Sequence, residues 1–447
     1  MAERSRVRPV SAEEATRDLV EHLRGGGVYW AAIVVLAVLA VAGTVALGRL
    51  VASGPQPYAK WGYTAAVVAF LISTFQAAPV VTFTSRLGKG FWGIPLRRAA
   101  ELGTLASLVT MPLLIVLLFQ LPDFQGRPSI WFDWPGGPRL WDAVAIVVFA
   151  VLGLGLLFLS SLPDLAAARD ARPRGLFRRL SLGWRGTTRQ WQVLSAGVVV
   201  LGAFYLMLFV FVNLLVVSDL ALSLVPGWHS AVMPPYHALS GLEAGVATTL
   251  LLLAGLRRFG GLERYIGLDP FWAAAKLLLP LTLLFFYFTW AELLTNWYGR
   301  LPDEQQVFFL FMFGPYLWPF VLSFGLNFVV PFLLLIWNPI RVSIAGPTAV
   351  AALVVIGSLV DRVRIYVPAW SIAGPVTETI DQLPPFQPPE LSDFLIVLGA
   401  VALVGLLYLL AMRLFLPVSL WEYKQGVLLS RERAFVKTEL TVLAKPR

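Results

Sequence analysis

Apolar runs of about 20 residues recur along almost the whole chain, and they constrain its fold more than any other feature. An α-helix needs roughly 20 apolar residues to cross about 30 Å of hydrocarbon. Of the 447 residues, 58% are hydrophobic and only 14% are charged, which is not the balance of a water-soluble domain of this size. The alternating pattern of a β-barrel is absent. The chain is therefore predicted to be an all-α integral membrane protein.

Charges, prolines and glycines bound these runs and predict ten transmembrane helices. Their ranges are 28–49, 61–85, 100–120, 140–162, 191–217, 236–257, 271–296, 313–337, 345–366 and 391–415. The regular alternation is compatible with two four-helix bundles, about 61–217 and about 236–366, flanked by the first and last helices. The predicted divisions are an N-terminal arm at 1–27, the membrane domain at 28–415 and a C-terminal tail at 416–447.

Lys and Arg are distributed unevenly over the two faces of this arrangement. Most of the 35 fall in the N-terminal arm, in the loops on the same side and in the tail. The other face and its helix ends hold Arg49, Lys60, Arg127, Arg139, Arg300, Arg362 and Arg364. Cytosolic loops carry the excess of positive charge, so both termini are predicted to be cytosolic. This excess accounts for the net charge of +9, and lipid rather than nucleic acid is the expected partner.

Cysteine is absent from the chain, and histidine occurs three times. The missing thiols exclude disulfides, cysteine-ligated iron–sulfur clusters and c-type haem attachment within this chain. A buried haem with two axial histidines needs imidazoles on facing helices, but His229 and His237 share one outer segment and His22 lies in the arm. No haem, iron–sulfur cluster or metal is therefore expected in this chain.

Polar residues gather toward the predicted outer ends of the spans. They are Gln120, Asp142, Asp219, His229, Glu292 and Arg362. An ionisable group in hydrocarbon costs about 3 kcal/mol or more, so such positions point to function. Carboxylates and imidazoles suit the deprotonation of a quinol, whose ring and tail would lie among apolar helices. The alternative is that Asp219 caps a helix and His229 bonds a loop carbonyl.

A second group of polar residues is a candidate proton path. It comprises Glu101, Glu243, Lys276, Tyr287 and Glu292. The alternatives are that the two acids of spans six and seven are neutral and make interhelical hydrogen bonds, and that Lys276 extends to the cytosolic interface. No phosphate-binding loop or dinucleotide fingerprint is present.

Several stretches resemble a known family. The most specific is SDLALSLVPGWHSAVMPPYHALSG at 218–241, with an aspartate, then P-G-W-H-S, P-P-Y and small residues. Others, in agreeing order and spacing, are LWDAVA at 140–145, LPDLAAARD at 162–170, GWRGTTRQW at 183–191, GPYLWPF at 314–320 and the pair Asp361-Arg362. From about residue 96 to 364 the chain resembles the NrfD/polysulfide-reductase type of quinone-interacting membrane subunit. It is similar in particular to the ActC-type subunit of bacterial alternative complex III.

This resemblance implies a respiratory role in the bacterial cytoplasmic membrane. It implies two four-helix bundles and a (mena)quinol site near the periplasmic face of the first. In such complexes electrons pass to a periplasmic iron–sulfur subunit and onward to c-type cytochromes or a molybdenum enzyme, beside other membrane subunits. The resemblance carries a pocket role to Asp142 and Asp219 and a rim role to Arg362. Chemistry adds His229 as a proton acceptor. The remaining expected pocket residues are Gln120, Trp228 and Tyr236.

One departure from the family pattern lies at the outer end of the third span. Family members carry a His there, before a Gly-Arg pair, whereas LFQLPDFQGR offers glutamines, Gln120 among them. Glutamine can hydrogen-bond a quinone oxygen but cannot accept its proton. A non-catalytic anchor or assembly subunit therefore remains an alternative to a quinol-oxidising subunit, which would not be an enzyme alone. An ion or solute transporter is a further alternative, although no interrupted helices meeting at the midplane are predicted.

Overall fold

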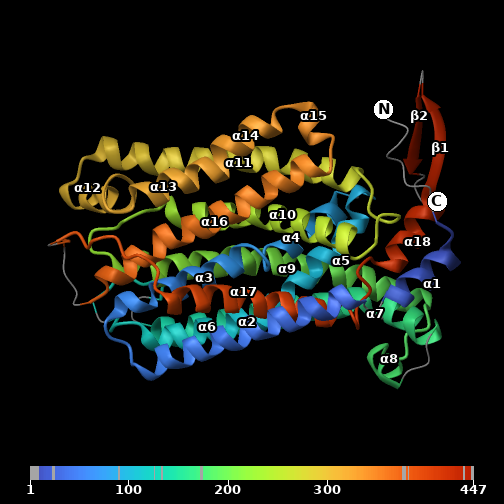
Figure 1. The fold of residues 1–447 in the computed structure, drawn as a ribbon, viewed down its shortest axis with the longest axis horizontal. Helices are drawn as coiled ribbons and strands as arrows, with labels where there is room; N and C mark the ends of the chain where they lie inside the picture. Colours follow the sequence, from blue (N-terminus) through green and yellow to red (C-terminus); the bar gives the residue numbers. More distant parts are fainter. Residues whose placement is uncertain are drawn as a thin grey trace.

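The structure, a computed structural model, is a bundle of long helices that run side by side along the longest axis of the molecule (Figure 1). The described residues are 10–22, 26–88, 91–124, 126–131, 134–171, 175–374, 379–380, 382–435 and 438–443. Helices α1, α8 and α18 lie at one end of the bundle, and α12 lies at the other end.

The secondary structure is helical from the arm to the start of the tail. The α-helices are α1 (Ala12–His22), α2 (Gly27–Ala52), α3 (Gly62–Ser73), α4 (Ala78–Leu87), α5 (Ile94–Glu101), α6 (Ser107–Gln120), α7 (Gly137–Ala171), α8 (Gly175–Leu180), α9 (Thr188–Leu220), α10 (Met233–Phe259), α11 (Asp269–Gly299), α12 (Pro302–Phe308), α13 (Leu317–Phe324), α14 (Val330–Leu335), α15 (Asn338–Arg341), α16 (Ala345–Ile372), α17 (Leu391–Ala411) and α18 (Leu420–Leu429). The 3-10 turns are η2 (Tyr58–Trp61), η3 (Phe91–Gly93), η4 (Leu102–Ala106) and η5 (Leu222–Leu224), and the π-helical turns are η6 (Phe309–Phe313) and η7 (Gly325–Val329).

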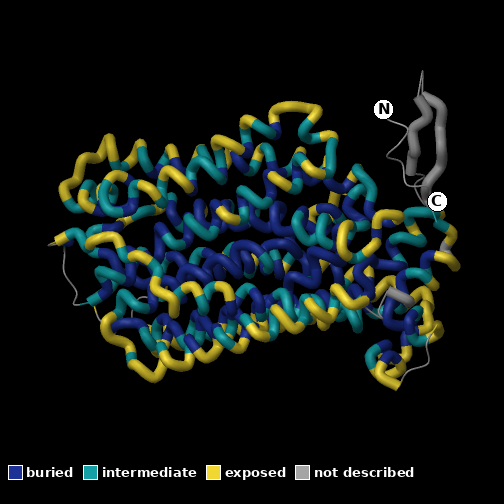
Figure 2. Tube along the Cα trace, in the orientation of Figure 1, coloured by how far each residue is buried: buried dark blue, intermediate teal, exposed yellow. Residues whose placement is uncertain are grey.

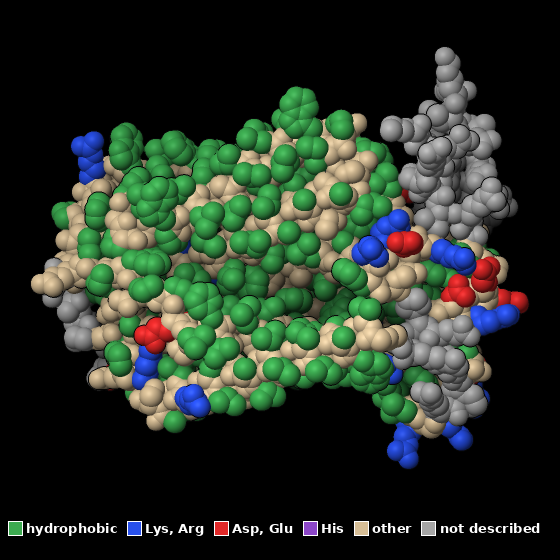
Figure 3. All heavy atoms as spheres, in the orientation of Figure 1, with side chains coloured by type: hydrophobic (Ala, Val, Ile, Leu, Met, Phe, Trp, Pro, Cys, Tyr) green, Lys and Arg blue, Asp and Glu red, His purple; other side chains and the backbone are tan. Residues whose placement is uncertain are grey.

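Among the described residues, nine helices are long and apolar enough to cross a membrane. Their ranges are Gly27–Ala52, Tyr58–Leu87, Ile94–Gln120, Gly137–Ala171, Thr188–Leu224, Met233–Phe259, Asp269–Gly299, Leu317–Leu335 and Leu391–Ala411. Hydrophobic side chains cover the broad flank of the bundle, while charged ones gather toward its ends (Figure 3). The predicted class, a multi-pass helical membrane protein, is confirmed.

Two parts of the structure differ from the prediction of ten equivalent spans in an all-α chain. The predicted ninth span, 345–366, forms the 28-residue helix α16, which is not among the nine candidates and carries buried Asp361, Arg362 and Arg364. In the tail, where no strand was predicted, β1 (Ser430–Phe435) pairs antiparallel with β2 (Thr438–Leu443).

The run Tyr58–Leu87 forms the centre of the bundle. In its most apolar stretch 94% of the residues are buried, against 17% for α2 at the periphery. The same contrast is visible between the dark centre and the lighter edges of Figure 2. Helix α16 packs along α3 and α10, and α7 packs along α9. Polar residues on α3, α9, α10 and α16 therefore meet inside protein rather than in lipid.

Helices α2 and α17 pack closely against each other along their length. At Gly43 an added Cβ would lie 2.6 Å from the Cα of Gly399, so neither position has room for a side chain. Small residues permit such close backbone approach between membrane helices. The first and last predicted spans thus form a pair beside the central helices.

Two of the candidate spans are interrupted near the centre of the bundle. Residues 74–77 form a turn between α3 and α4, and η4 separates α5 from α6. Pro79 has no amide to donate to the carbonyl of Phe75, four residues earlier, which favours the first break. A Cβ on Gly103 would lie 2.3 Å from that carbonyl oxygen, so the second break packs directly on the first.

This close contact makes a stability prediction for Gly103→Ala. The added methyl group must displace the carbonyl of Phe75, so we expect the free energy of unfolding to fall by about 1–3 kcal/mol. Thermal unfolding in detergent measures the change. Gly155→Ala is the matched control, because a Cβ there meets nothing within 4 Å. An equal effect of both substitutions would contradict the packing argument.

Candidate functional site

A pair of buried carboxyl groups lies where α7 begins and α9 ends. Asp142 is 3% exposed and Asp219 is fully buried. The helices are antiparallel neighbours, and Asp142 lies five residues after the start of α7 while Asp219 lies one residue before the end of α9. These offsets bring the two side chains into contact with each other. The sequence-predicted pocket residues Asp142 and Asp219 are therefore together.

The two carboxyl groups have different hydrogen bonding. The indole Nε1 of Trp131 donates to Asp142 Oδ1 at 2.7 Å. Asp219 faces Asp142 and lies against two hydrogen-bond donors, the Ser129 hydroxyl and the Ile130 amide, although none of these contacts has the geometry of a well-formed hydrogen bond. Because these contacts are imperfect, the oxygens of Asp219 can accept from an additional donor.

Arg127, in the loop before α7, hydrogen-bonds two later segments of the chain. Its Nη1 donates to the carbonyl of Ser223 at 3.2 Å, and its Nη2 donates to the carbonyl of Gly374. The Ser223 hydroxyl in turn donates to the backbone carbonyl of Asp219 at 2.9 Å. Arg127 belongs to the Gly-Arg pair in the sequence, but no site role was assigned to it.

A second buried polar cluster is centred on α16. Asp361 accepts from Arg362 at 3.0 Å, from Arg364 at 2.7 Å and from the hydroxyl of Tyr236 at 2.9 Å. All four residues are at most 4% exposed. The predicted residues Arg362 and Tyr236 thus meet through Asp361, on the α10–α16 contact rather than beside Asp219.

Arg362 links this cluster to the central helix α3. Its Nη2 donates to Ser73 Oγ at 3.0 Å, to Ser240 Oγ at 2.8 Å and to the carbonyl of His237 at 3.2 Å. Ser73 is the last residue of α3, immediately before the break. The guanidinium therefore connects α16 and α10 to the interruption in α3–α4.

His237 is a buried member of the same cluster. Its Nδ1 lies 3.0 Å from Asn213 Oδ1, and its Nε2 lies 2.9 Å from the hydroxyl of Tyr366. Sequence reasoning excluded His237 as a haem ligand and placed it at the border of the quinol pocket, but did not choose it as a site residue. The helical spacing of His237, Ser240 and Gly241, which share one face of α10, is the signal that predicts burial here.

Glu243 lies two turns after Tyr236 on the same face of α10. It is 1% exposed, and its Oε1 has no hydrogen-bond partner. Asp361 and Arg362 lie within electrostatic reach of its carboxyl group. Glu243 thus lies next to the cluster of Asp361, Arg362, Arg364 and Tyr236, called the α16 cluster below. This buried position is the one expected for a residue of the predicted proton path.

Glu292, on α11, is another acid of the predicted proton path. It contacts the loop before α10. Its Oε2 accepts from the Ser230 hydroxyl at 2.6 Å. Trp228 lies beside it and packs on Phe311 with ring centroids 4.4 Å apart. Glu292 is also within electrostatic reach of Arg364, so it lies at the edge of the α16 cluster.

Several predicted site residues lie outside the buried clusters. His229 is exposed, and within the described part of the chain no hydrogen bond joins it to Asp142 or Asp219. The structure therefore does not bring His229 and Asp219 to one buried pocket. Gln120 is half-buried at the end of α6.

Two members of the predicted proton path face outward on α11. Tyr287 is 60% exposed. Lys276 is exposed, with its ammonium 3.8 Å from the centroid of the Trp272 ring. This contact on the helix surface is the arrangement expected of a side chain that extends along the helix toward the interface. A buried path cannot pass through these two side chains as they stand.

Glu101 belongs to a buried ionic cluster at the end of the bundle that carries α1 and α18. Arg86 lies 2.6 Å from Glu101 Oε1, Arg98 lies 3.3 Å from Oε2, and Ser160 donates to Oε2 at 2.7 Å. Arg98 also pairs with Asp164 at 2.8 Å. The carboxyl group of Glu101 is thus held by cations as well as by a hydroxyl.

The tail helix α18 completes this ionic cluster. Glu422 Oε1 lies 2.9 Å from Arg97 and 3.1 Å from Arg86. Burial alone raises the pKa of Glu422, but the two guanidinium groups outweigh it and hold that pKa below its usual range. The nearby indole of Trp421 donates to the carbonyl of Ser160 at 3.1 Å. The tail is therefore bound to the membrane domain by a charged contact.

The depressed pKa predicts how Glu422 affects stability. An acid whose pKa is lower in the folded than in the unfolded protein stabilises the fold at pH values above its unfolded-state pKa. This stabilisation is lost as the pH falls through the folded-state pKa. We expect Glu422→Gln to lower the free energy of unfolding by about 1–3 kcal/mol at pH 7. The difference from wild type should shrink only below pH 4.5, the ordinary glutamate value. Thermal unfolding at pH 7 and pH 4 tests this, and a difference that grows on acidification would contradict it.

Comparison with protein-family models finds none that matches this chain, and comparison with curated proteins likewise finds no match.

Proposed function

We propose that this chain is the membrane subunit of a respiratory quinol oxidoreductase complex. It binds (mena)quinol near the periplasmic face and passes electrons to an iron–sulfur subunit, with c-type cytochromes or a molybdenum enzyme beyond. The observation that carries this proposal is the buried carboxyl pair, Asp142 and Asp219, whose side chains are in contact with each other. The family resemblance of the surrounding stretches supports it.

The residues around the pair fit a quinol head group. When bound, a quinol supplies two electrons and two hydroxyl protons. Asp219 accepts the two hydroxyl protons in turn and releases the first toward the periplasmic side before it takes the second, because its buried oxygens lack well-formed hydrogen bonds. Asp142 takes part in holding that proton, since two carboxylates in contact repel when both are ionised. Trp131 fixes the orientation of Asp142 through its indole hydrogen bond.

We further propose that α16 is a tenth membrane span and that both termini are cytosolic. Helices α1 and α18 lie at the same end, where the backbone amide of Val10 donates to the Tyr423 hydroxyl at 3.1 Å. A chain whose two ends lie on the same side of a membrane must cross it an even number of times. The nine candidate helices give an odd number, and α16 supplies the tenth crossing. The excess of Lys and Arg at this end supports the cytosolic assignment.

Analysis of the purified native complex tests the proposed function. Solvent extraction should recover about one bound quinone per chain, and the co-purifying subunits should include an iron–sulfur protein. Asp219→Asn should reduce the bound quinone while keeping the partners. Partners retained without any quinone, in wild type as well, would overturn quinol binding and favour a non-catalytic anchor.

Proton translocation is the second candidate function, supported by a polar stripe on the third candidate span. Glu101, Thr104, Ser107 and Thr110 recur every three residues and are at most 1% exposed. The 3-10 turn η4 has about three residues per turn, which favours one common face. The hydroxyls of Thr104 and Ser107 have no hydrogen-bond partner, so they are available to a mobile proton or water.

This stripe reaches the break in α3–α4 and the α16 cluster beyond it. Thr110 donates to Gln76 Oε1 at 2.8 Å, inside the break. Ser73, on the other side of the break, receives Arg362. Interrupted helices deep in a bundle are typical of ion pathways, and the turn at 74–77 packed against η4 supports this second candidate. The route we propose runs from Glu101 to Glu243 and leaves out Lys276 and Tyr287.

Reconstituted complex tests the proton route. The substitution Glu243→Gln replaces the carboxyl group next to the α16 cluster with an amide, which cannot accept and release a proton in its place. We expect proton uptake per quinol oxidised to fall at least severalfold while electron transfer continues. Unchanged proton uptake would contradict the route, and a parallel loss of electron transfer would place Glu243 in quinol chemistry instead.

A further inference from the structure

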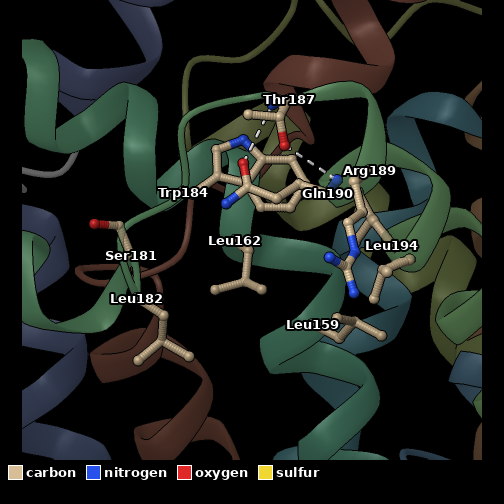
Figure 4. A pocket seen from close by; sticks show the side chains of 10 residues that line it. Leu159, Leu162, Ser181, Leu182, Trp184, Thr187, Arg189, Gln190 and Leu194 are labelled. Carbon is tan, nitrogen blue, oxygen red and sulfur yellow. Dashed lines mark hydrogen bonds between the residues drawn. The ribbon is translucent and has the colours of Figure 1, made fainter.

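A pocket of about 280 Å³ opens where α7 and α9 meet the turn after α8, away from the carboxyl pair and the α16 cluster (Figure 4). Its lining is aliphatic and aromatic on the helix side and polar on the turn side. The lining residues are Leu159, Leu162, Ser181, Leu182, Trp184, Thr187, Arg189, Gln190, Val193 and Leu194. The pocket thus combines an apolar wall with a polar rim.

The pocket lies at the boundary between the lipid-facing surface and the charged end of the molecule. On α9, exposed apolar residues continue from the pocket toward the other end, with Val193 60%, Val200 51% and Met207 65% exposed. On the turn side, Leu182 is 69% exposed. Apolar side chains exposed at such a boundary are expected to contact acyl chains.

Positive charge is concentrated around the pocket. The stretch 169–189 is rich in arginine and contains a single acid, Asp170. That acid pairs with Arg169 at 2.8 Å, and Arg169 also donates to the carbonyl of Trp184 at 3.1 Å. Among the described residues, the side chains of Arg178, Arg179, Arg185 and Arg189 have no acidic partner within salt-bridge distance. The local charge is therefore left for a ligand to neutralise.

Arg189 directs its guanidinium over the apolar wall of the pocket. Figure 4 shows this group between Leu159 and Leu194. The first turn of α9 is already capped, because Thr187 Oγ1 accepts from the Gln190 amide at 3.3 Å and Gln190 Oε1 accepts from the Thr187 amide at 3.2 Å. Arg189 is thus the charged residue of the pocket lining that is available to a bound anion.

We propose that this pocket binds the phosphate head group of an anionic phospholipid, with Arg189 on the phosphate. The pocket is smaller than cavities that enclose a whole drug-sized ligand, about 300–1,000 Å³. It holds the head group and the first methylenes, which contact Leu159 and Leu162, while the acyl chains continue along Val193 and the exposed face of α9. Basic pockets beside membrane helices bind such head groups. This site does not depend on quinol binding.

Native mass spectrometry of the purified, delipidated full chain tests the site. Phosphatidylglycerol, phosphatidylcholine and inorganic phosphate are titrated separately, and the Kd of the first bound molecule is measured. We expect phosphatidylglycerol to bind tightest and Arg189→Gln to weaken it about fivefold, since one arginine near a membrane surface contributes about 1 kcal/mol. Val193→Trp, which narrows the pocket without changing charge, should also weaken binding.

Arg258→Gln is the matched control, because this exposed arginine lies at the end of α10 and does not line the pocket. It should leave the Kd within twofold of wild type. Equal weakening by Arg189→Gln and Arg258→Gln would overturn the site in favour of general charge attraction. Equal affinity for the two lipids, or inorganic phosphate binding as tightly as the anionic lipid, would also overturn it.

Discussion

Asp219→Asn is expected to reduce quinol oxidation by the intact complex by about 10²–10⁴-fold. The substitution keeps the size of the side chain but removes the carboxylate of the pair that lacks a well-formed hydrogen bond, and a positioned base contributes about that factor. Steady-state oxidation of a soluble quinol analogue, at matched amounts of assembled complex, measures the loss.

Asp269→Asn provides the control for this experiment. Asp269 is exposed in the first turn of α11, so its amide variant should retain wild-type turnover. If Asp219→Asn also retained full turnover, the carboxyl pair would not be the quinol site. The lipid pocket at α7–α9 would be unaffected by that result.

Asp361→Asn is expected to destabilise the protein by about 3–5 kcal/mol. The carboxylate is the shared partner of Arg362 and Arg364, and its loss leaves two cations buried without their direct acid. Removing one member of a buried ion pair typically has an effect of this size. Thermal unfolding in detergent measures it.

A charge-balanced double variant separates electrostatics from packing. Asp361→Asn with Arg364→Gln removes one acid and one cation, so it should recover part of the stability lost in the single variant. A double variant less stable than the single one would show that the hydrogen bonds around Asp361, including that of Tyr236, matter more than its charge.

The membrane class and most helix positions could be predicted from the sequence, because long apolar runs have few alternatives in hydrocarbon. The carboxyl pair could also be predicted, since Asp142 and Asp219 lie at the ends of neighbouring antiparallel helices. The strands of the tail were not predicted. Neither were the breaks at 74–77 and at η4, whose apolar sequences read as continuous spans.

Whether each side chain points toward lipid or toward protein was harder to predict from the sequence. A membrane helix is apolar on both its lipid side and its protein side, so periodicity does not separate Tyr287, which is exposed, from Glu292, which is buried. The partners of Asp361 depend on how α10 crosses α16, which is a tertiary property. His237 was not chosen as a site residue for the same reason, since its contacts come from α9 and α16.

The position of Glu422 has a consequence for biogenesis. Arg86 and Arg97 are made early in translation, but the carboxylate that both contact lies on α18, after the last span. Until α18 has been synthesised, these two guanidinium groups lack that carboxylate. A nascent chain that stops before residue 420 therefore leaves Arg86 with Glu101 as its acidic contact and Arg97 without the Glu422 carboxylate, so docking of α18 is the step that completes this ionic cluster.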